Sequence, residues 1–468
     1  DGSSNFSEGN RWGTFPSAAI AWRVKEESFL KDVKAISNAK VRIGWGQTGN
    51  AGGIAGRSTY ALSSADTKYN FYAPGLGGGT TGSFDRVVGF YAPLVDTNLK
   101  WETNEQTNFG LDLGFLNNDL TVTMDFFTRK TKDLLLERQI RPSAGNTSIY
   151  TNYGQIDNTG FEFSVNYNKK LNKDWAINVA FNGSTLKNKI KKMGADYTAT
   201  CTGGNSTYSA DEIDGSNLGA VSGTGFNWNN HSICREGEAV GSYYGYKVAG
   251  IIKTQEQLDK AKAQGQDAQI GDFLFVDTDK NGTLDDNDRV ILGNGLPKFN
   301  FGLNLSATYK DWDFSLYTYG VLGMDILSYS KMRLSIMNPS DDSWTPALLK
   351  DSYNNMYNAE TNPNGTLPRL TRLDNNKNSR ISDAWVENGN FLKISNIQVG
   401  YNVPKKFLSS FGLTAVRAYV AVQNLCTISP YSKYGDPEVG QGSVIYSGLD
   451  TGRYATPRTY MCGLNITF

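Results

Sequence analysis

The sequence predicts an all-β protein in which about eleven strands form part of a transmembrane antiparallel β-barrel with long extracellular loops. Three observations support this fold class. Apolar and polar residues alternate along many segments, the connections alternate between short and long, and aromatic residues stand near segment ends. Trp175 and Trp312, for example, each open a segment just after a tight turn.

The composition suits many half-buried strands and excludes other classes. The chain has 468 residues, 46 Lys+Arg against 46 Asp+Glu, and a mean hydropathy of −0.43. The charge balance argues against a nucleic-acid-binding protein, and no run of about 18 apolar residues offers a transmembrane helix. The single histidine, His231, has no partner motif. Since no catalytic constellation is present, we expect no enzymatic activity and no catalytic cofactor.

The period-two pattern identifies the strands. In one segment Phe161 and Phe163 flank Glu162, so one face is apolar and the other polar. The segments with this pattern are 18–24, 41–46, 109–115, 120–126, 161–168, 175–186, 299–306, 312–318, 391–403, 416–424 and 460–468. A soluble sandwich would also alternate, but the small, hydrated polar face favours a water-filled lumen. The residues expected to line it are Asp112, Asp125, Glu162, Asn166, Asn178, Asn182, Asn304 and Tyr317.

Connection lengths test the barrel independently, because outer-membrane barrels have short periplasmic turns and long outer loops. Connections at one end are tight or modest: 116–119, 170–174, 310–311, 25–38 and 404–415. Those at the other end are long: 47–103, 131–158, 187–296, 322–385 and 425–458. The apolar piece 243–252 would break this alternation as a spanning strand, so we place it inside an outer loop.

An odd number of strands is unusual, because single-chain bacterial barrels usually have an even number. Residues 1–6 look like the end of a preceding upward strand. We therefore expect residues 1–468 to be the C-terminal part of a larger barrel, with its first half upstream.

Several long blocks, in order, resemble SusC/RagA-type TonB-dependent outer-membrane transporters of Gram-negative bacteria. The most diagnostic is GDFLFVDTDKNGTLDDNDRVILGNGLPKFNFGLNLSATYKDWDFSLYTYGVLG at 271–323. The other blocks are 1–24, 40–50, 99–135, 158–168, 387–404, 422–439 and 454–468. The resemblance spans essentially the whole chain.

The resemblance implies a 22-stranded barrel with an N-terminal plug, so that eleven strands are half of it. It also implies a SusD-like surface lipoprotein as a lid, a dimer of transporter–lipoprotein pairs, and energy from the TonB complex acting through the plug. The cargo would be a glycan or an oligopeptide, and outer-membrane lipid would surround the barrel. The plug, the TonB box and the first half-barrel are not in residues 1–468.

Residues 277–288 have the spacing of an EF-hand-like loop. Oxygen ligands fall at positions 1, 3, 5, 7, 9 and 12, with Gly282 at position 6 for the sharp turn. The candidate ligands are Asp277, Asp279, Asn281, Thr283, Asp285 and Asp288. A structural calcium or magnesium ion is one interpretation; a polar turn closed by its own hydrogen bonds is the other.

Two further groups of residues have open roles. Loop 47–103 carries a group of aromatic residues with three alternative roles: stacking on sugar rings, packing against a lipoprotein, or burying one another. These residues are Tyr60, Tyr69, Phe71, Tyr72, Phe90 and Tyr91. Cys201 and Cys234 share one outer loop, where a disulfide would contribute about 3–4 kcal/mol. Cys426 and Cys462 are expected at the outer rim, either bridged or as two small lipid-facing side chains.

The predicted function is therefore TonB-dependent import of a nutrient together with a surface lipoprotein. A passive porin or adhesin barrel is the alternative, and it would conduct without TonB and without a lid. A soluble extracellular carbohydrate-binding β protein is a third possibility, against which the alternating apolar faces argue.

Overall fold

A computed structural model describes residues 1–52, 64–71, 85–91, 96–139, 148–193, 231–336, 348–371, 373–408, 412–440 and 444–468. Its main element is an antiparallel sheet of eleven strands in the order β1-β2-β5-β6-β9-β10-β16-β17-β20-β21-β23. The strands are β1 Ser17–Trp22, β2 Ile36–Asn50, β5 Glu102–Phe115, β6 Leu120–Lys132, β9 Gln155–Lys170, β10 Trp175–Lys192, β16 Phe299–Tyr309, β17 Trp312–Leu322, β20 Phe391–Asn402, β21 Ala415–Ile428 and β23 Thr459–Thr467.

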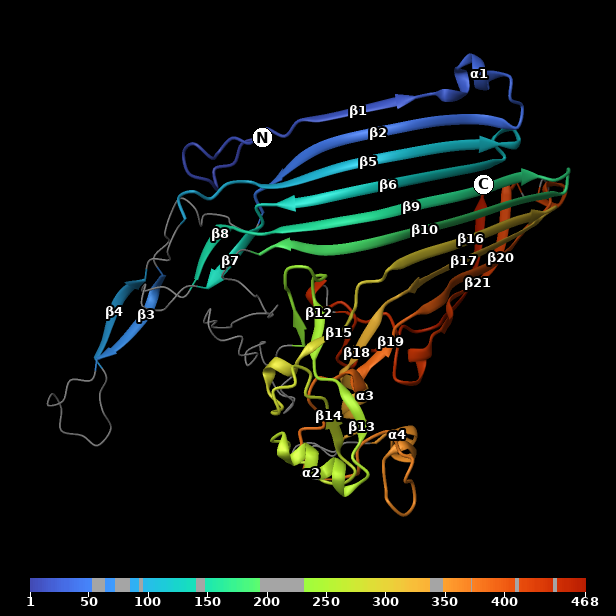
Figure 1. The fold of residues 1–468 in the computed structure, drawn as a ribbon. Coiled ribbons are helices and arrows are strands. Elements are labelled where there is room, and N and C mark those ends of the chain that lie inside the picture. Colours follow the sequence, from blue (N-terminus) through green and yellow to red (C-terminus); the bar gives the residue numbers. More distant parts are fainter. Residues whose placement is uncertain are drawn as a thin grey trace.

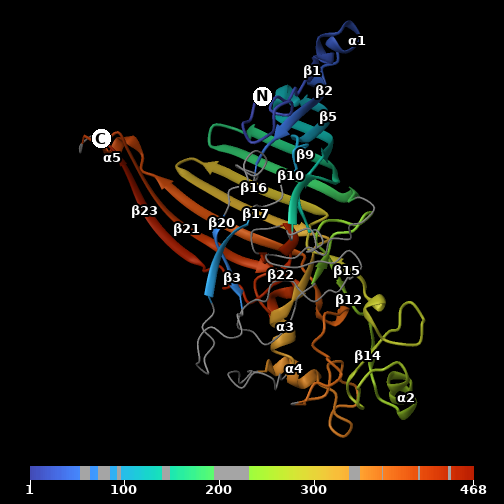
Figure 2. The ribbon, with the colours of Figure 1, turned by 90° about the vertical axis from the view of Figure 1, so that its left-hand side faces the viewer.

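These strands run side by side, and the sheet curves into an open trough with β1 and β2 at one edge and β21 and β23 at the other (Figures 1 and 2). All eleven predicted segments coincide with these strands, so the prediction of strand number and position is confirmed. The alternation that predicted them reflects two different environments: the concave face and the convex face.

Several strands are longer than their apolar patterns. β10, for example, has 18 residues, whereas about 9–11 tilted residues cross a bilayer. Its last part, from Lys187 to Lys192, is rich in lysine and shows no apolar alternation. Period-two patterning marks only the part of a strand that has one apolar side, which explains why the sequence underestimates the strand lengths.

Short turns gather at one end of the sheet, as predicted. Between β5 and β6 a one-turn 3₁₀ segment, Leu116–Asn118, reverses the chain with φ of 54°, 58° and 67°. Aromatic pairs mark the same end: the rings of Trp175 and Tyr309 lie 4.5 Å apart. Such a girdle is typical of a membrane interface.

Described segments of three long connections, 187–296, 322–385 and 425–458, form a smaller domain at the other end of the sheet (Figure 1). Its strands are β11 Ser232–Ile233, β12 Ser242–Gly245, β13 Val248–Ile251, β14 Phe273–Phe275, β15 Val290–Asn294, β18 Asp325–Ser328, β19 Val386–Asn388 and β22 Leu449–Asp450. Its helices are α2 Gln255–Ala263, α3 Tyr329–Arg333 and α4 Lys350–Asn355. Segment 243–252 lies here and not in the large sheet, as expected.

The remaining strands and α-helices of the described residues are two hairpins in other long connections and two short helices near the short turns. They are β3 Ser64–Phe71 with β4 Asp85–Tyr91, β7 Leu135–Gln139 with β8 Ser148–Asn152, α1 Ser28–Lys31 and α5 Lys405–Leu408. Among the described residues no helix is long and apolar enough to cross a membrane.

The loop domain has an aromatic core. Trp385 and Tyr243 are fully buried, and the Trp385 ring lies 5.8 Å from that of Phe273. The Tyr243 hydroxyl lies 2.8 Å from the carbonyl oxygen of Ser447, which belongs to the last long connection. Segments from three connections therefore share one core, and this fixes their positions over the end of the sheet.

Candidate functional site: the concave face and the outer loops

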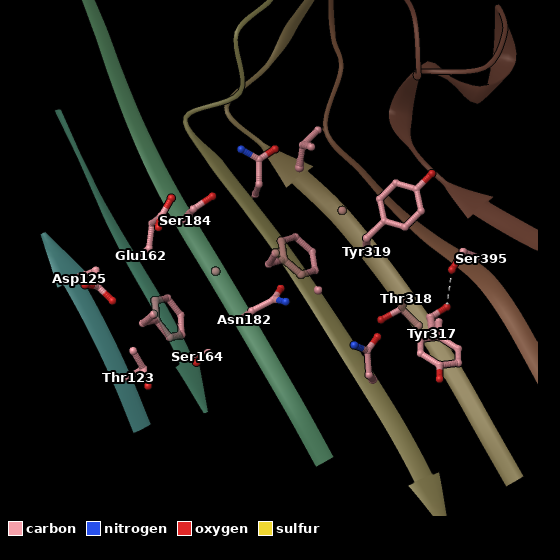
Figure 3. A pocket seen from close by; sticks show the side chains of 18 residues that line it. Thr123, Asp125, Glu162, Ser164, Asn182, Ser184, Tyr317, Thr318, Tyr319 and Ser395 are labelled. Atoms are coloured by element: carbon pink, nitrogen blue, oxygen red, sulfur yellow. Dashed lines mark hydrogen bonds between the residues drawn. The ribbon is translucent and has the colours of Figure 1, made fainter. Parts of the chain in front are cut away.

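The concave face of the sheet carries a polar cavity of about 640 Å³. Asp125, Glu162 and Asn182 project into it from β6, β9 and β10, and Tyr317 and Tyr319 from β17 (Figure 3). The register explains this arrangement, because Glu162 pairs with both Asp125 and Ser184 and all three share one face. Five of the residues predicted to line a lumen are confirmed here: Asp125, Glu162, Asn182, Asn304 and Tyr317.

A charged network braces one side of this face. Arg42 of β2 donates from Nε and one Nη to both oxygens of Asp112, each at 2.9 Å, and donates to Asp125 at 3.0 Å. Gly110 of β5 leaves room for this network, since a Cβ there would stand 2.6 Å from the Arg42 guanidinium carbon and the arginine side chain would have to shift. One Asp125 oxygen, Oδ1, is buried without a hydrogen-bond partner.

The last long connection is anchored on the same face. Glu438 accepts a hydrogen bond from the Tyr319 hydroxyl and forms an ion pair with Lys393 of β20. The Lys393 side chain is only 4% exposed, so the ion pair is largely removed from water. A second anchor is Tyr431, fully buried, whose hydroxyl binds Ser328 and Asp450 in the loop domain.

The acidic loop 277–288 brings part of the predicted ligand set together. One oxygen each of Asp277, Asp279 and Asp288 lies within 4.8 Å of the other two. Asp288 is fully buried and accepts hydrogen bonds from the backbone of Thr278 and Asp285. This makes it a structural clamp at the end of the loop.

Asp277, which is half-buried, is the one of the three with a buried oxygen that has no hydrogen-bond partner. Its Oδ2 accepts from the Gly282 backbone at 2.9 Å, while its buried Oδ1 has no hydrogen-bond partner. Burial works to raise the pKa of Asp277, but the surrounding backbone N–H groups outweigh it and hold the pKa below its ordinary value. The carboxylate is therefore ionised and carries one lone-pair site with no donor.

The other predicted ligands are engaged locally. Asp285 accepts from the Asn287 backbone and from the Asn281 amide, which also donates to Asp279. The Thr283 backbone N–H donates to the Asn281 side chain at 2.7 Å. These contacts are those of a self-capped polar turn, so both interpretations of the loop share the same geometry.

Comparison with known proteins decides the family. Residues 1–425 match the family model of the TonB-dependent receptor-like β-barrel. The chain belongs to this family. TonB-dependent receptor P3 of Formosa agariphila is 34% identical over 487 residues, covering all of this chain and 43% of that receptor. TonB-dependent receptor SusC of Bacteroides thetaiotaomicron is 32% identical, covering all of this chain and 41% of that receptor.

Solved structures agree on the fold. The RagAB peptide transporter superposes with a TM-score of 0.71 at 20% identity, covering all of this chain and 44% of that one. The chain is thus an outer-membrane β-barrel segment that spans less than half the length of the relatives it matches. The short turns of such barrels face the periplasm, which orients the sheet and places the loop domain outside the cell.

The cysteines of the receptor separate into two cases. Cys234 is disulfide-bonded, and its predicted partner, Cys201, lies outside the described residues. Of the two alternatives left open for Cys426 and Cys462, the bridge is wrong, because both thiols are free. Cys462 pairs with Val420, six residues before Cys426, which is about 20 Å along the strand and far beyond the ~7 Å limit for a bridge.

The predicted aromatic group of the receptor is only partly placed. Tyr69 and Phe71 fall on β3, and Phe90 and Tyr91 fall on β4 or its end, so four of the six share one hairpin. Tyr60 and Tyr72 lie outside the described residues. The proposed roles of these residues in stacking on sugars or on a lipoprotein stay predictions.

Sequence reasoning missed Arg42, Lys393 and Glu438. For Arg42 a signal existed: it stands at a polar position of segment 41–46, between Val41 and Ile43. For the other two no local signal exists, because a strand residue and a loop residue 45 positions apart meet only in the folded chain.

Proposed function

We propose that this chain is the C-terminal half of the barrel of an active importer. In this proposal a plug and the remaining strands come from the rest of the protein, and TonB supplies the energy through the plug. The cargo is a glycan or an oligopeptide, delivered by a SusD-like surface lipoprotein, in a dimer of transporter–lipoprotein pairs. The names of the relatives, a TonB-dependent receptor SusC and a RagAB peptide transporter, support this class of cargo and partner.

The observation that carries the proposal is the polar, concave face of a sheet whose outer strands, β1 and β23, each have one edge without a partner strand among the described residues. A sheet edge cannot stay open in lipid, because each unpaired backbone group costs several kcal/mol there. Additional strands must close the sheet, and closure turns the concave cavity into a lumen. Its amide, hydroxyl and carboxylate groups suit a hydrated, hydrogen-bonding cargo.

The experiment measures uptake of labelled oligosaccharides and oligopeptides by cells carrying the full-length receptor and its lipoprotein. Asn304→Trp narrows the cavity, whereas Leu305→Trp places the same ring on the convex face of the same strand. We expect the first variant to lose most uptake and the second to keep it. Uptake that survives both an uncoupler and loss of TonB would favour the porin alternative and refute an energised importer.

A second proposal concerns calcium, favoured by the ionised Asp277 with its unpartnered oxygen beside Asp279 and Asp288. The ion would be structural, bound in the 10⁻⁴–10⁻³ M range typical of extracellular sites. Terbium luminescence on the purified receptor tests it, with Asp277→Asn as the variant and the exposed Asp259→Asn on α2 as its matched control. Equal terbium binding by both variants would refute the site.

A further inference from the structure

The convex face of the sheet carries a groove of about 560 Å³ near the short turns. Two rows of paired residues form it, one from Tyr401 through Ala418 to Leu464, the other from Val399 through Val420 to Cys462. The small side chain of Ala418 stands between two large neighbours, which makes the depression. Trp312, with its ring 4.8 Å from that of Tyr401, closes one side.

The groove is apolar, open to the membrane, and of the size that holds a small-molecule ligand or a lipid chain. Leu464 and Val420 are 60% and 59% exposed, so no segment of the described chain covers them. Its depth in the membrane follows from the register. Trp312 is the first residue of β17 and Tyr401 the penultimate residue of β20, so the groove opens toward the periplasmic interface.

Cations stand at that end of the groove. Lys405 and Lys406 are exposed on α5, three and four residues beyond the end of β20, and Lys310 is exposed in the turn before Trp312. Lys406 lies 4.9 Å from the ring of its neighbour Phe407, which is itself 57% exposed. Asp311 is the one carboxylate in the turn at residues 310–311. Lysines next to an apolar surface at an interface favour anionic lipid headgroups.

We propose that the groove binds one glycerophospholipid of the periplasmic leaflet. An acyl chain lies over Ala418 between Tyr401 and Leu464, and the phosphate contacts Lys405 and Lys406. The site differs from the general lipid shell in two ways: the register builds a depression there, and the cations stand at its interfacial end. It needs only the outer-membrane location, and it is independent of the cargo.

Native mass spectrometry of the full-length receptor, purified from outer membranes in mild detergent, counts retained phospholipids. We expect one phospholipid on the wild type and at least a fivefold lower retained fraction for Ala418→Trp. Ala307→Trp is the matched control, because Ala307 lies on the same convex face of β16 outside the groove. Equal loss in both variants would mean a non-specific lipid shell and would overturn the proposal.

Charge reversal tests the headgroup contact in the same measurement. Lys405→Glu combined with Lys406→Glu should lower phospholipid retention at least fivefold. The control pair, Lys31→Glu with Lys34→Glu, reverses two exposed lysines in another short turn and should leave retention unchanged. If the first pair of substitutions leaves phospholipid retention unchanged, the phosphate contact is refuted.

The free thiol of Cys462 gives a readout on the unmodified protein. It lines the groove, whereas the second free thiol, Cys426, lies outside it. Adding phosphatidylglycerol to the delipidated receptor should slow maleimide labelling of Cys462 at least fivefold and leave the rate at Cys426 unchanged. Unchanged labelling of Cys462 would overturn the proposal, as would protection by dimerisation of the receptor without lipid.

Discussion

The ion pair between Glu438 and Lys393 leads to the sharpest prediction. Glu438→Gln keeps the shape of the side chain but leaves the Lys393 ammonium, 4% exposed, without its carboxylate. Breaking a buried pair from one side costs about 3–5 kcal/mol. Because the Glu438 side chain is 22% exposed, water recovers part of this, and we expect about 2–3 kcal/mol, or about 30- to 150-fold more opening of the loop.

Hydrogen–deuterium exchange of residues 430–440 in the full-length receptor measures this opening. Tyr319→Phe is the graded control, since it removes one neutral donor to Glu438 and should raise exchange only about 2- to 12-fold. The exchanged pair, Lys393→Glu with Glu438→Lys, should recover most of the protection. Exchange of Glu438→Gln within twofold of the wild type would refute the reasoning, because the loop would then be held by its other contacts.

Three further predictions concern the loop domain and the thiols. Trp385→Ala should destabilise the loop domain by about 3–5 kcal/mol, seen as faster proteolysis of residues 231–298. Burial alone would raise the pKa of Asp436, but backbone and hydroxyl donors outweigh burial and lower this pKa in the folded protein. The ionised Asp436 therefore stabilises the fold above about pH 4, and this stabilisation is lost as the pH falls through the folded pKa. Exchange protection of residues 430–440 should therefore fall in acid, and Asp436→Asn should flatten that fall. Without reductant, iodoacetamide should alkylate Cys426 and Cys462, read by peptide mapping.

The barrel could be predicted from the sequence because each strand lies between two uniform environments. Phe161 is an exposed apolar side chain outside the cavity while its neighbour Glu162 lines the cavity, and a similar apolar–polar alternation repeats along the strands of the sheet. Aromatic residues such as Trp175 mark the interface by their own chemistry. These signals are local in the sequence, so they can be recognised without knowledge of the fold.

What failed depended on register and on non-local contact. The bridge from Cys426 to Cys462 assumed that both stand at the rim, but β21 continues to Ile428, five residues past Gln423, the last residue that pairs with β23. The spacing of acidic residues identified the loop, but it could not reveal that the Asp285 oxygens accept hydrogen bonds from Asn281 and Asn287. Strand register and the choice of hydrogen-bond partners depend on which groups meet in the folded chain, and a sequence pattern does not contain this information.

The last long connection joins the wall of the barrel to the loop domain. Glu438 binds the concave face through Lys393. Seven residues earlier in the sequence, the connection is anchored by Tyr431, which binds Ser328 and Asp450 of the loop domain. An occupant of the cavity that competes for Tyr319, which lines it, would remove one contact of Glu438 and so weaken one of the two anchors. The shift cannot exceed the free energy of the Glu438 contacts, about 2–3 kcal/mol.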